Sequence, residues 1–264
     1  MLSMMIAAAA LAGAPAQAPA PTNFIAQTVH VEGDLHSAFR TCLTRVELPR
    51  WRSLHRRKVI VSNAVYEKTG DLNNLAGPDW SHLVVSELKA GARGDSLIAG
   101  VARCAKDAGG TVVRAESMVA TPNSYHPGKR LSEAPRRPDL AFLVEFIPVQ
   151  PTKAALDEYR EIMRTSIGPA MGRLVAEGAH QNLIALETTS GASWAPGAFA
   201  WNQIHIRGFY PDPGPTSPAM TRYMEEVNPA LGGFANVFAR LDAIRSKPRD
   251  AVARELVELR LERP

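Results

Sequence analysis

The sequence predicts an α+β fold built from two tandem βαββαβ repeats, and three observations support this prediction. When the chain is offset against itself by 120 residues, Pro49 falls on Pro169 and Glu67 falls on Glu187. The expected strands and helices follow the same order in both halves, as an internal duplication requires. The composition, 45% hydrophobic and 21% charged over 264 residues, is that of an ordinary globular chain with room for a sizeable core.

Hydrophobic periodicity defines the elements of the first repeat. Alternating and β-branched residues indicate strands, while apolar residues at helical spacing after an Asp34 N-cap indicate a helix. Pro49 interrupts this helix, and a glycine pair at 109–110 ends a second one. The expected elements are a strand over 24–32, a helix over 34–57, strands over 59–68 and 81–88, a helix over 96–108 and a strand over 111–120.

The second repeat has the same order with a longer final helical region. Thr152 is the expected N-cap of its first helix, and Pro169 interrupts that helix as Pro49 does in the first repeat. Asn228-Pro229 and a glycine pair at 232–233 break the last helical region. The expected elements are a strand over 140–147, a helix over 152–174, strands over 181–188 and 201–210, a helical region over 217–245 and a strand over 256–262.

The N-terminal residues 1–18 are expected to be a signal peptide rather than part of the fold. An apolar stretch is followed by the small-x-small pattern Ala16-Gln17-Ala18, although no Lys or Arg precedes it. The alternative is a start codon assigned too early, ahead of an Ala/Pro-rich tail. With export, most simply to a bacterial periplasm, the expected domains are a first repeat over 19–122, a basic Pro-rich linker over 123–138 and a second repeat over 139–264.

The two cysteines, Cys42 and Cys104, lie on the two expected helices of the first repeat. In an oxidising compartment they could form a disulfide, because these helices should be neighbours. The alternative is two buried free thiols that act as small hydrophobic groups. Two cysteines without a Cys-x-x-Cys spacing support neither a thiol redox motif nor a Cys-rich zinc site, so no metal site is expected.

A βαββαβ unit is a ferredoxin-like sandwich that carries both helices on one face of its sheet and leaves the other face bare. The helix around Pro169 (Arg160–Leu174, REIMRTSIGPAMGRL), together with a tryptophan that opens the third strand of each repeat (Trp80 and Trp201), resembles the dimeric α/β-barrel superfamily. The resemblance implies that two such sheets pack face to face. A tandem duplication would place both halves in one chain.

The resemblance leaves the activity open. The superfamily includes cofactor-free cyclases, isomerases, lyases and monooxygenases, heme-binding peroxidase relatives and proteins without known activity. Histidines on or near strands could in principle bind heme iron, but no spacing selects one of them and no Cys-x-x-Cys-His is present. No cofactor is therefore expected, and heme is the alternative.

The strongest candidate site is the third strand of the second repeat. Period-two alternation places four side chains on one face and isoleucines on the other. If the isoleucine face meets the helices, the polar face looks into the space between the sheets. The alternative is a solvated polar face. The four side chains are Trp201, Gln203, His205 and Arg207.

The corresponding strand of the first repeat carries fewer of these candidate side chains on the same face. With a one-residue slip, Trp80 and His82 align with Trp201 and Gln203. They are candidates for the same ligand, the alternative being a core or interface tryptophan and a hydrogen-bonded surface histidine.

Three further positions have a structural and a functional interpretation. Glu67 and Glu187 occupy matching strand positions and could act as paired bases, but solvated carboxylates are the simpler interpretation. Glu145, in an apolar strand, is either exposed at an edge or buried with a raised pKa, and exposure is the preferred interpretation. Tyr159 aligns with Phe39 and is interpreted as core.

The formal charge of +4 is unevenly distributed. Residues 1–138 hold 17 basic and 11 acidic residues, and the remainder holds 13 and 15. A basic stripe over 40–58 could attract an anionic partner, but a solvated helix face is the simpler interpretation. Export and the lack of interleaved aromatic residues argue against nucleic acid. No apolar run is long enough to span a bilayer.

Two functions follow, and both use a small hydrophobic or aromatic ligand. In the first, the chain is a cofactor-free lyase, cyclase or isomerase, with His205 as acid/base, Arg207 as anion or carbonyl anchor and Trp201 as pocket wall. In the second, it is a non-catalytic periplasmic ligand-binding or envelope protein. A purely structural protein whose barrel interior is filled by side chains remains a third alternative, and any of these could form a homo-oligomer.

Overall fold

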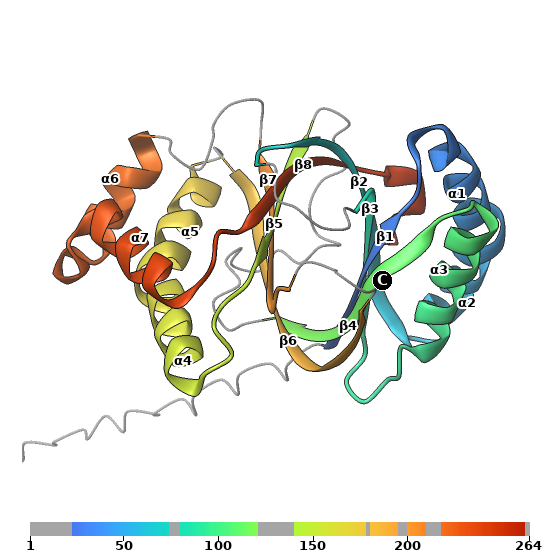
Figure 1. Cartoon of the computed structure of the whole chain (residues 1–264), viewed down its shortest axis with the longest axis horizontal. Helices are drawn as coiled ribbons and strands as arrows, with labels where there is room; N and C mark the ends of the chain where they lie inside the picture. Colours follow the sequence, from blue (N-terminus) through green and yellow to red (C-terminus); the bar gives the residue numbers. More distant parts are fainter. Residues whose placement is uncertain are drawn as a thin grey trace, which may run out of the picture.

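The fold is an eight-stranded closed barrel with a layer of helices on either side (Figure 1). The computed structural model describes residues 23–73, 80–120, 140–177, 180–194, 200–209 and 218–261. The expected signal peptide and the linker over 123–138 lie outside the described residues, so the proposed domain boundaries stay predictions. Within the described part of the chain, no helix has the length and apolar character needed to cross a membrane.

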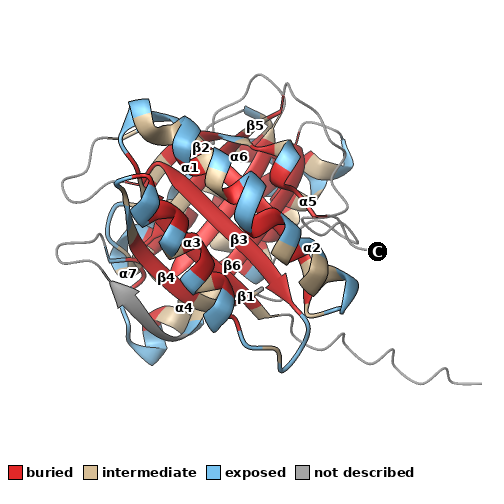
Figure 2. Ribbon diagram, turned by 90° about the vertical axis from the view of Figure 1, so that its right-hand side faces the viewer, coloured by how far each residue is buried: buried red, intermediate tan, exposed pale blue. Residues whose placement is uncertain are grey.

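The first repeat contributes four strands and three helices. Its strands run in the spatial order β4-β1-β3-β2, which is the order of a ferredoxin-like sheet. Helices α1, α2 and α3 cover one face of this sheet (Figure 2). The elements are β1 (Asn23–His30), α1 (His36–Cys42), α2 (Leu48–Arg56), β2 (Ile60–Asp71), β3 (His82–Leu88), α3 (Asp95–Asp107) and β4 (Thr111–Ala120).

The second repeat has the same topology, with the spatial order β8-β5-β7-β6. Its helical layer lies on the opposite side of the barrel from the first (Figure 1). The elements are β5 (Ala141–Ile147), α4 (Lys153–Ile162), α5 (Gly168–Ala176), β6 (His180–Trp194), β7 (Gln203–Phe209), α6 (Pro218–Val227), α7 (Gly233–Ile244) and β8 (Arg249–Glu255). The expected α+β fold of two tandem ferredoxin-like repeats is therefore confirmed.

The duplication extends to an unusual helical turn. A π-helical segment joins α1 to α2 over Leu43–Glu47, and another joins α4 to α5 over Met163–Ile167. In both repeats a proline, Pro49 or Pro169, stands in the first turn of the following helix. Proline lacks an N–H and clashes with the carbonyl one turn earlier, so a widened turn lets the chain continue in helical form without that hydrogen bond.

Two pairings between the repeats close the barrel. Strand β2 pairs with β8, and β4 pairs with β6, both antiparallel. The interior is packed by apolar side chains from both sheets, including Phe24, Tyr66, Phe142 and Ile184. Two further cores lie between each sheet and its own helices. The face that each sheet leaves free of helices is therefore buried against the other repeat.

The predicted last strand is wrong in position. The structure places β8 at Arg249–Glu255, and the expected strand segment begins with a short 3-10 helix at Val257–Leu259. The leucines of this segment, Leu256, Leu259 and Leu261, pack into the helix-side core of the first repeat. The charged residues of β8 obscure its strand pattern, but the barrel junction accommodates them, since Arg254 pairs with Glu67 on the neighbouring strand.

The disulfide between Cys42 and Cys104 is confirmed and joins α1 to α3. It closes a loop with a sequence separation of 62 residues. A cross-link over a loop of this length restricts the unfolded chain strongly, which favours the folded state.

We expect the double variant C42A/C104A to lower the free energy of unfolding by about 2–4 kcal/mol, because the unfolded chain regains the lost freedom. Denaturant unfolding without reductant measures this difference. Wild-type protein unfolded with excess dithiothreitol is the control and should approach the variant. An unchanged free energy of unfolding would contradict the role assigned to the bond.

Candidate functional site

The polar face of β7 points at the helices, not into the barrel. His205 is buried and its Nε2 lies 2.9 Å from the hydroxyl of Tyr159 on α4. Ile204 and Ile206 belong to the core inside the barrel. The expectation that the isoleucine face meets the helices is therefore wrong. The closed interior leaves its polar groups little access to solvent, so the more apolar face of the strand turns inward.

The two tryptophans do not line a ligand site with His205. Trp80 and Trp201 lie in the barrel core on either side of Phe146, with ring centroids 5.4 Å and 5.2 Å from that ring. Both residues precede their strands, so the alternation within the strand does not govern them. The expectation that Trp201 forms a pocket wall and Trp80 its counterpart is wrong; both are core aromatic residues.

A cavity of about 190 Å³ lies between the second sheet and helices α4 to α7. The strands supply polar side chains to this cavity, which we call the β7 pocket, and the helices supply an apolar wall. His205 and Arg207 both line it, whereas the buried Gln203 does not. The apolar lining is Ile147, Met163, Ile167, Met171, Leu183, Met220, Phe238 and Leu241.

The polar side of the β7 pocket is a row across three adjacent strands. Glu145 on β5 stands opposite His205 on β7 and opposite Asp250 on β8. Its Oε2 lies 3.1 Å from Arg207 Nε and 3.8 Å from His205 Nδ1. Glu145 is thus partly buried and ion-paired, and the sequence-based preference for an exposed edge position is wrong.

Burial sets the protonation states beneath the pocket. Desolvation lowers the pKa of His205 to about 4, although the nearby Glu145 acts in the opposite direction. Burial also raises the pKa of Tyr159, so its hydroxyl stays protonated. A neutral imidazole beside a carboxylate holds its proton on the nitrogen facing that carboxylate, Nδ1. Tyr159 therefore donates a hydrogen bond to His205 Nε2. This nitrogen is thus occupied, and His205 is not free to act as a base.

Four buried polar atoms at the β7 pocket have no hydrogen-bond partner among the described residues: Arg207 Nε and Nη2, Asp250 Oδ1 and Arg245 Nε. Of these, Arg207 Nε is ion-paired with Glu145. Burial and then the charge of Glu145 raise the pKa of Asp250 to about 6. The site thus offers an arginine nitrogen without a hydrogen-bond partner, Arg207 Nη2, and a carboxyl group that titrates near pH 6. Buried polar groups of this kind are normally satisfied, so a ligand or water is expected beside them.

Sequence reasoning missed Asp250 and Tyr159. Asp250 lies outside the segment expected to be a strand, and no local pattern marks it. Tyr159 is buried as expected, but its hydroxyl serves the site. The tyrosine in place of the first repeat's Phe39 was the one available signal, because a buried hydroxyl needs a partner.

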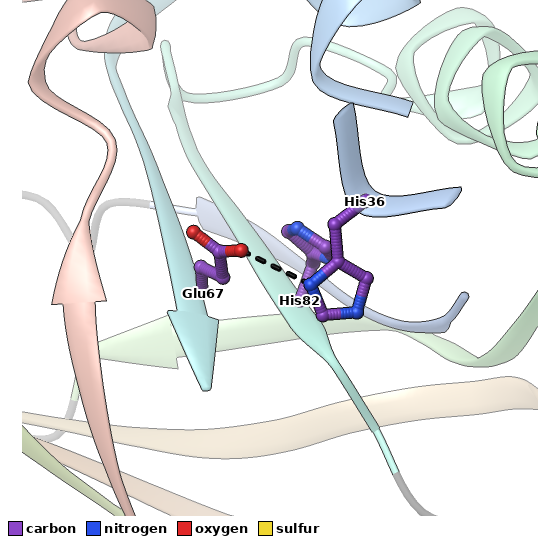
Figure 3. A group of neighbouring side chains, drawn as sticks. All are labelled: His36, Glu67 and His82. Carbon is purple, nitrogen blue, oxygen red and sulfur yellow. Dashed lines mark hydrogen bonds and ion pairs between the residues drawn. The ribbon is translucent and has the colours of Figure 1, made fainter. Parts of the chain in front are cut away.

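His82 belongs to a different cluster, in the first repeat. It is fully buried on the helix side of β3, beside His36 of α1 and Glu67 of β2 (Figure 3). Glu67 pairs across the strands with His82 as Glu187 pairs with Gln203, so the structure confirms their alignment. The interpretation of His82 as a surface residue is wrong.

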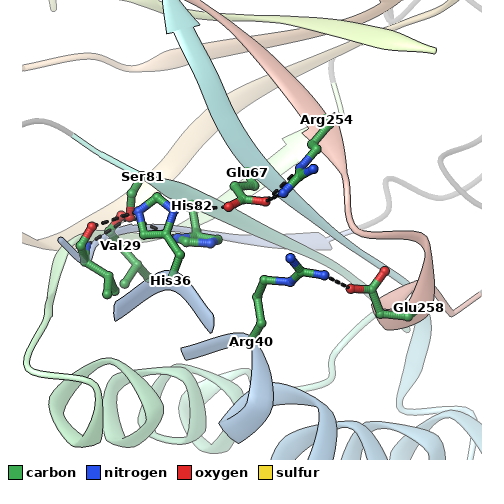
Figure 4. Close-up of polar contacts among 9 residues, drawn as sticks. Val29, His36, Arg40, Glu67, Ser81, His82, Arg254 and Glu258 are labelled. Carbon is green, nitrogen blue, oxygen red and sulfur yellow. Dashed lines mark hydrogen bonds and ion pairs between the residues drawn. The ribbon is translucent and has the colours of Figure 1, made fainter. Parts of the chain in front are cut away.

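The matched carboxylates Glu67 and Glu187 do not form a catalytic pair. Glu67 accepts hydrogen bonds from Arg254 and contacts His36 (Figure 4). Glu187 accepts a hydrogen bond from Arg160 at 3.1 Å. Each carboxylate faces the helices of its own repeat, because both occupy the helix side of their strands. The barrel therefore separates the two.

No family model matches the chain, and a search of curated proteins found no match. Solved structures with similar folds include an anthrone oxidase-like protein (12% identity, 89% of this chain and 91% of the other, TM-score 0.49). They also include a mutant chlorite dismutase from Candidatus Nitrospira defluvii (11%, 90% and 93%, 0.47) and a heme-binding protein from Thermus thermophilus (14%, 90% and 92%, 0.45).

These likenesses are too remote to assign a function. The strand order itself confirms the expected resemblance to the dimeric α/β-barrel superfamily, with both halves in one chain. The Thermus thermophilus protein binds heme, but the β7 pocket of this chain does not fit that group. His205 already uses Nε2 for Tyr159, and about 190 Å³ is below the roughly 300–1,000 Å³ of pockets for drug-sized ligands.

Removing the Tyr159 hydroxyl tests the hydrogen bond between Tyr159 and His205. We expect Y159F to lower the free energy of unfolding by about 1–3 kcal/mol, because His205 Nε2 loses its partner while buried. Denaturant unfolding measures the change. Tyr→Phe at Tyr223, whose hydroxyl contacts Glu177 at a part-buried site, is the matched control and should cost less. An equal or smaller loss for Y159F would contradict the assignment.

The raised pKa of Asp250 predicts a pH-dependent stability. The unfolded chain loses this proton near pH 4 and the folded protein near pH 6, so the contribution of Asp250 to stability falls across that window. At pH 7 we expect the free energy of unfolding of D250N to exceed that of wild type by on the order of 1 kcal/mol after solvent screening. This difference should shrink toward pH 4.

Urea unfolding at several pH values measures this difference. The variant D107N, at an exposed carboxylate in the first repeat, is the control and should show no such window. If the free energies of unfolding of D250N and wild type differ by the same amount at every pH from 4 to 7, the raised pKa of Asp250 is refuted.

Proposed function

We propose that the chain binds a small apolar molecule carrying a carboxylate or carbonyl group, in the β7 pocket. The observation that carries the proposal is the pairing of an apolar wall with a buried, unpartnered Arg207 Nη2. An apolar cavity with a few convergent polar groups is the usual form of a ligand site. The volume of about 190 Å³ suits a molecule of one or two rings or a short chain.

The charges around the β7 pocket favour an anionic or strongly polarised group. Arg207, Arg245 and Lys247 line it against Glu145 and Asp250. Glu145 already faces Arg207 Nε, which leaves Nη2 to meet the ligand. A carboxylate or carbonyl oxygen there would accept a hydrogen bond from Nη2, which has no partner among the described residues.

The apolar wall favours an adaptable fit. Met163, Met171 and Met220 face the cavity, and the unbranched, polarisable methionine side chain adjusts to irregular or aromatic shapes. This supports the proposed hydrophobic or aromatic ligand. If residues 1–18 direct export, the ligand is met in the periplasm; that location remains part of the proposal.

Asp250 supports a second candidate function, a cofactor-free enzyme of the lyase, cyclase or isomerase type. A carboxyl group with a pKa of about 6 can exchange a proton near neutral pH. Asp250 would take this role, because Tyr159 occupies His205 Nε2. Arg207 would stabilise negative charge that develops on a substrate oxygen.

Binding is tested by calorimetry with benzoate, phenylacetate and indole-3-acetate and with the corresponding amides and alcohols. We expect the acids to bind best. R207Q should weaken their binding by about tenfold or more, the usual cost of losing a hydrogen bond to a charged group. R173Q, at a surface ion pair with Glu226, is the control and should bind as wild type does.

Absence of binding across this panel, or equal binding by R207Q, would refute the proposed ligand class. If acids bind, the same compounds with an acidic C–H group test for turnover by hydrogen–deuterium exchange in D₂O. Exchange that is lost in D250N while binding is retained would support the enzyme over the binder.

A further inference from the structure

The second cluster, in the first repeat, holds three side chains of the types that bind transition metals. One donor atom from each of His36, Glu67 and His82 lies within 4.8 Å of the other two (Figure 3). The β7 pocket, on the far side of the barrel, does not include them. The cluster therefore needs its own explanation.

The hydrogen bonds of His82 leave one nitrogen free. Its Nδ1 lies 2.9 Å from the Ser81 hydroxyl, which also lies 3.1 Å from the Val29 carbonyl (Figure 4). If Ser81 donates to that carbonyl, His82 holds its proton on Nδ1 and Nε2 is a bare lone pair. This Nε2 is buried and has no hydrogen-bond partner among the described residues. A buried imidazole lone pair without a proton donor is suited to a metal ion.

The hydrogen bonds of His36 require a cation beside Glu67. His36 Nε2 lies 3.0 Å from the carbonyl of Val31, which can only accept, so this nitrogen carries a proton. The other nitrogen, Nδ1, lies 3.1 Å from Glu67 Oε1. In a neutral imidazole, two acceptors would then face each other. Either a second proton or a metal ion must lie between them.

Glu67 is held in position by a separate contact. Arg254 donates to its Oε2 from Nε at 2.8 Å and from Nη2 at 2.6 Å. Oε1 therefore remains directed at the histidines. An orienting hydrogen bond on the far oxygen of a carboxylate, like the carbonyl on the far nitrogen of His36, is the outer support that metal ligands commonly have.

We propose that His36, Glu67 and His82 bind a divalent transition-metal ion, with Zn²⁺ as the ion whose ligand preference they match. Two imidazoles and one carboxylate form a three-ligand site that keeps a fourth position for water or another ligand. Tetrahedral ligation at about 2.0–2.1 Å places donors roughly 3.4 Å apart, so the cluster must contract. His36 can supply this movement, because it is the first residue of α1 and its side chain is partly exposed.

The second repeat provides an internal comparison. At the 120-residue offset Leu156 replaces His36, and Gln203 takes the place of His82. Glu187 remains but is paired with Arg160. The same scaffold thus folds without the two histidines. Folding alone does not explain their presence in the first repeat.

The test uses untagged full-length protein, treated with EDTA and dialysed, and titrated with Zn²⁺ by calorimetry and with Co²⁺ by absorption spectroscopy. We expect one ion per chain and a Co²⁺ spectrum of low coordination number. H82Q, which introduces the glutamine found at this position in the second repeat, should weaken Zn²⁺ binding by at least about tenfold. H36N and E67Q should do the same.

H30Q, at a partly exposed histidine that pairs with Glu32, is the matched control and should bind as wild type does. Circular dichroism checks that each variant folds. If H82Q fails to fold, H36N still tests the site, because His36 is partly exposed and its replacement disturbs the core less. The proposal is overturned if wild type takes up no Zn²⁺. Equal weakening by H30Q, or none by H36N and H82Q, would also overturn it and leave a protonated His36 paired with Glu67.

Discussion

The structure depends on one constraint: a ferredoxin-like sheet has two faces, and its helices cover only one. The chain meets this constraint by closing two sheets into a barrel through β2–β8 and β4–β6. The interior then buries the uncovered faces against each other, at a free-energy gain of roughly 25 cal/mol per Å² of apolar surface. The barrel interior is mainly aromatic and aliphatic, although it also buries an ion pair between Arg114 and Glu116 beside Trp201. The β7 pocket and the cluster around His82 both lie on the outer, helix-covered faces.

This arrangement gives the protein two separate helix-side locations with different contents. In the second repeat, α6 and α7 replace the single helix α3, and methionines beneath them leave the β7 pocket. In the first repeat, the corresponding region is closely packed around the disulfide and a histidine–glutamate cluster. Duplication therefore supplied one scaffold twice, and the residues on equivalent strands then diverged, as His82 and Gln203 show.

Much of the architecture could be predicted from local patterns. The two prolines and the repeated order of elements indicated a duplicated fold, and the structure repeats even the π-helical turn before each proline. The cysteines could be paired because both lie on helices of one repeat. The last strand was misplaced because the charges of β8 are compensated across the barrel junction, by a partner far away in sequence.

By itself, the sequence determined which side chains alternate on each strand and which repeat carries them: His205 and Arg207 share one face, and Ile204 and Ile206 the other. Only the tertiary structure decided which face turns inward. Alternation has a period but no direction, so it cannot tell a helix layer from a barrel interior. Closing the barrel made that choice, which moved the tryptophans into the core and brought Asp250 and Tyr159 to the site.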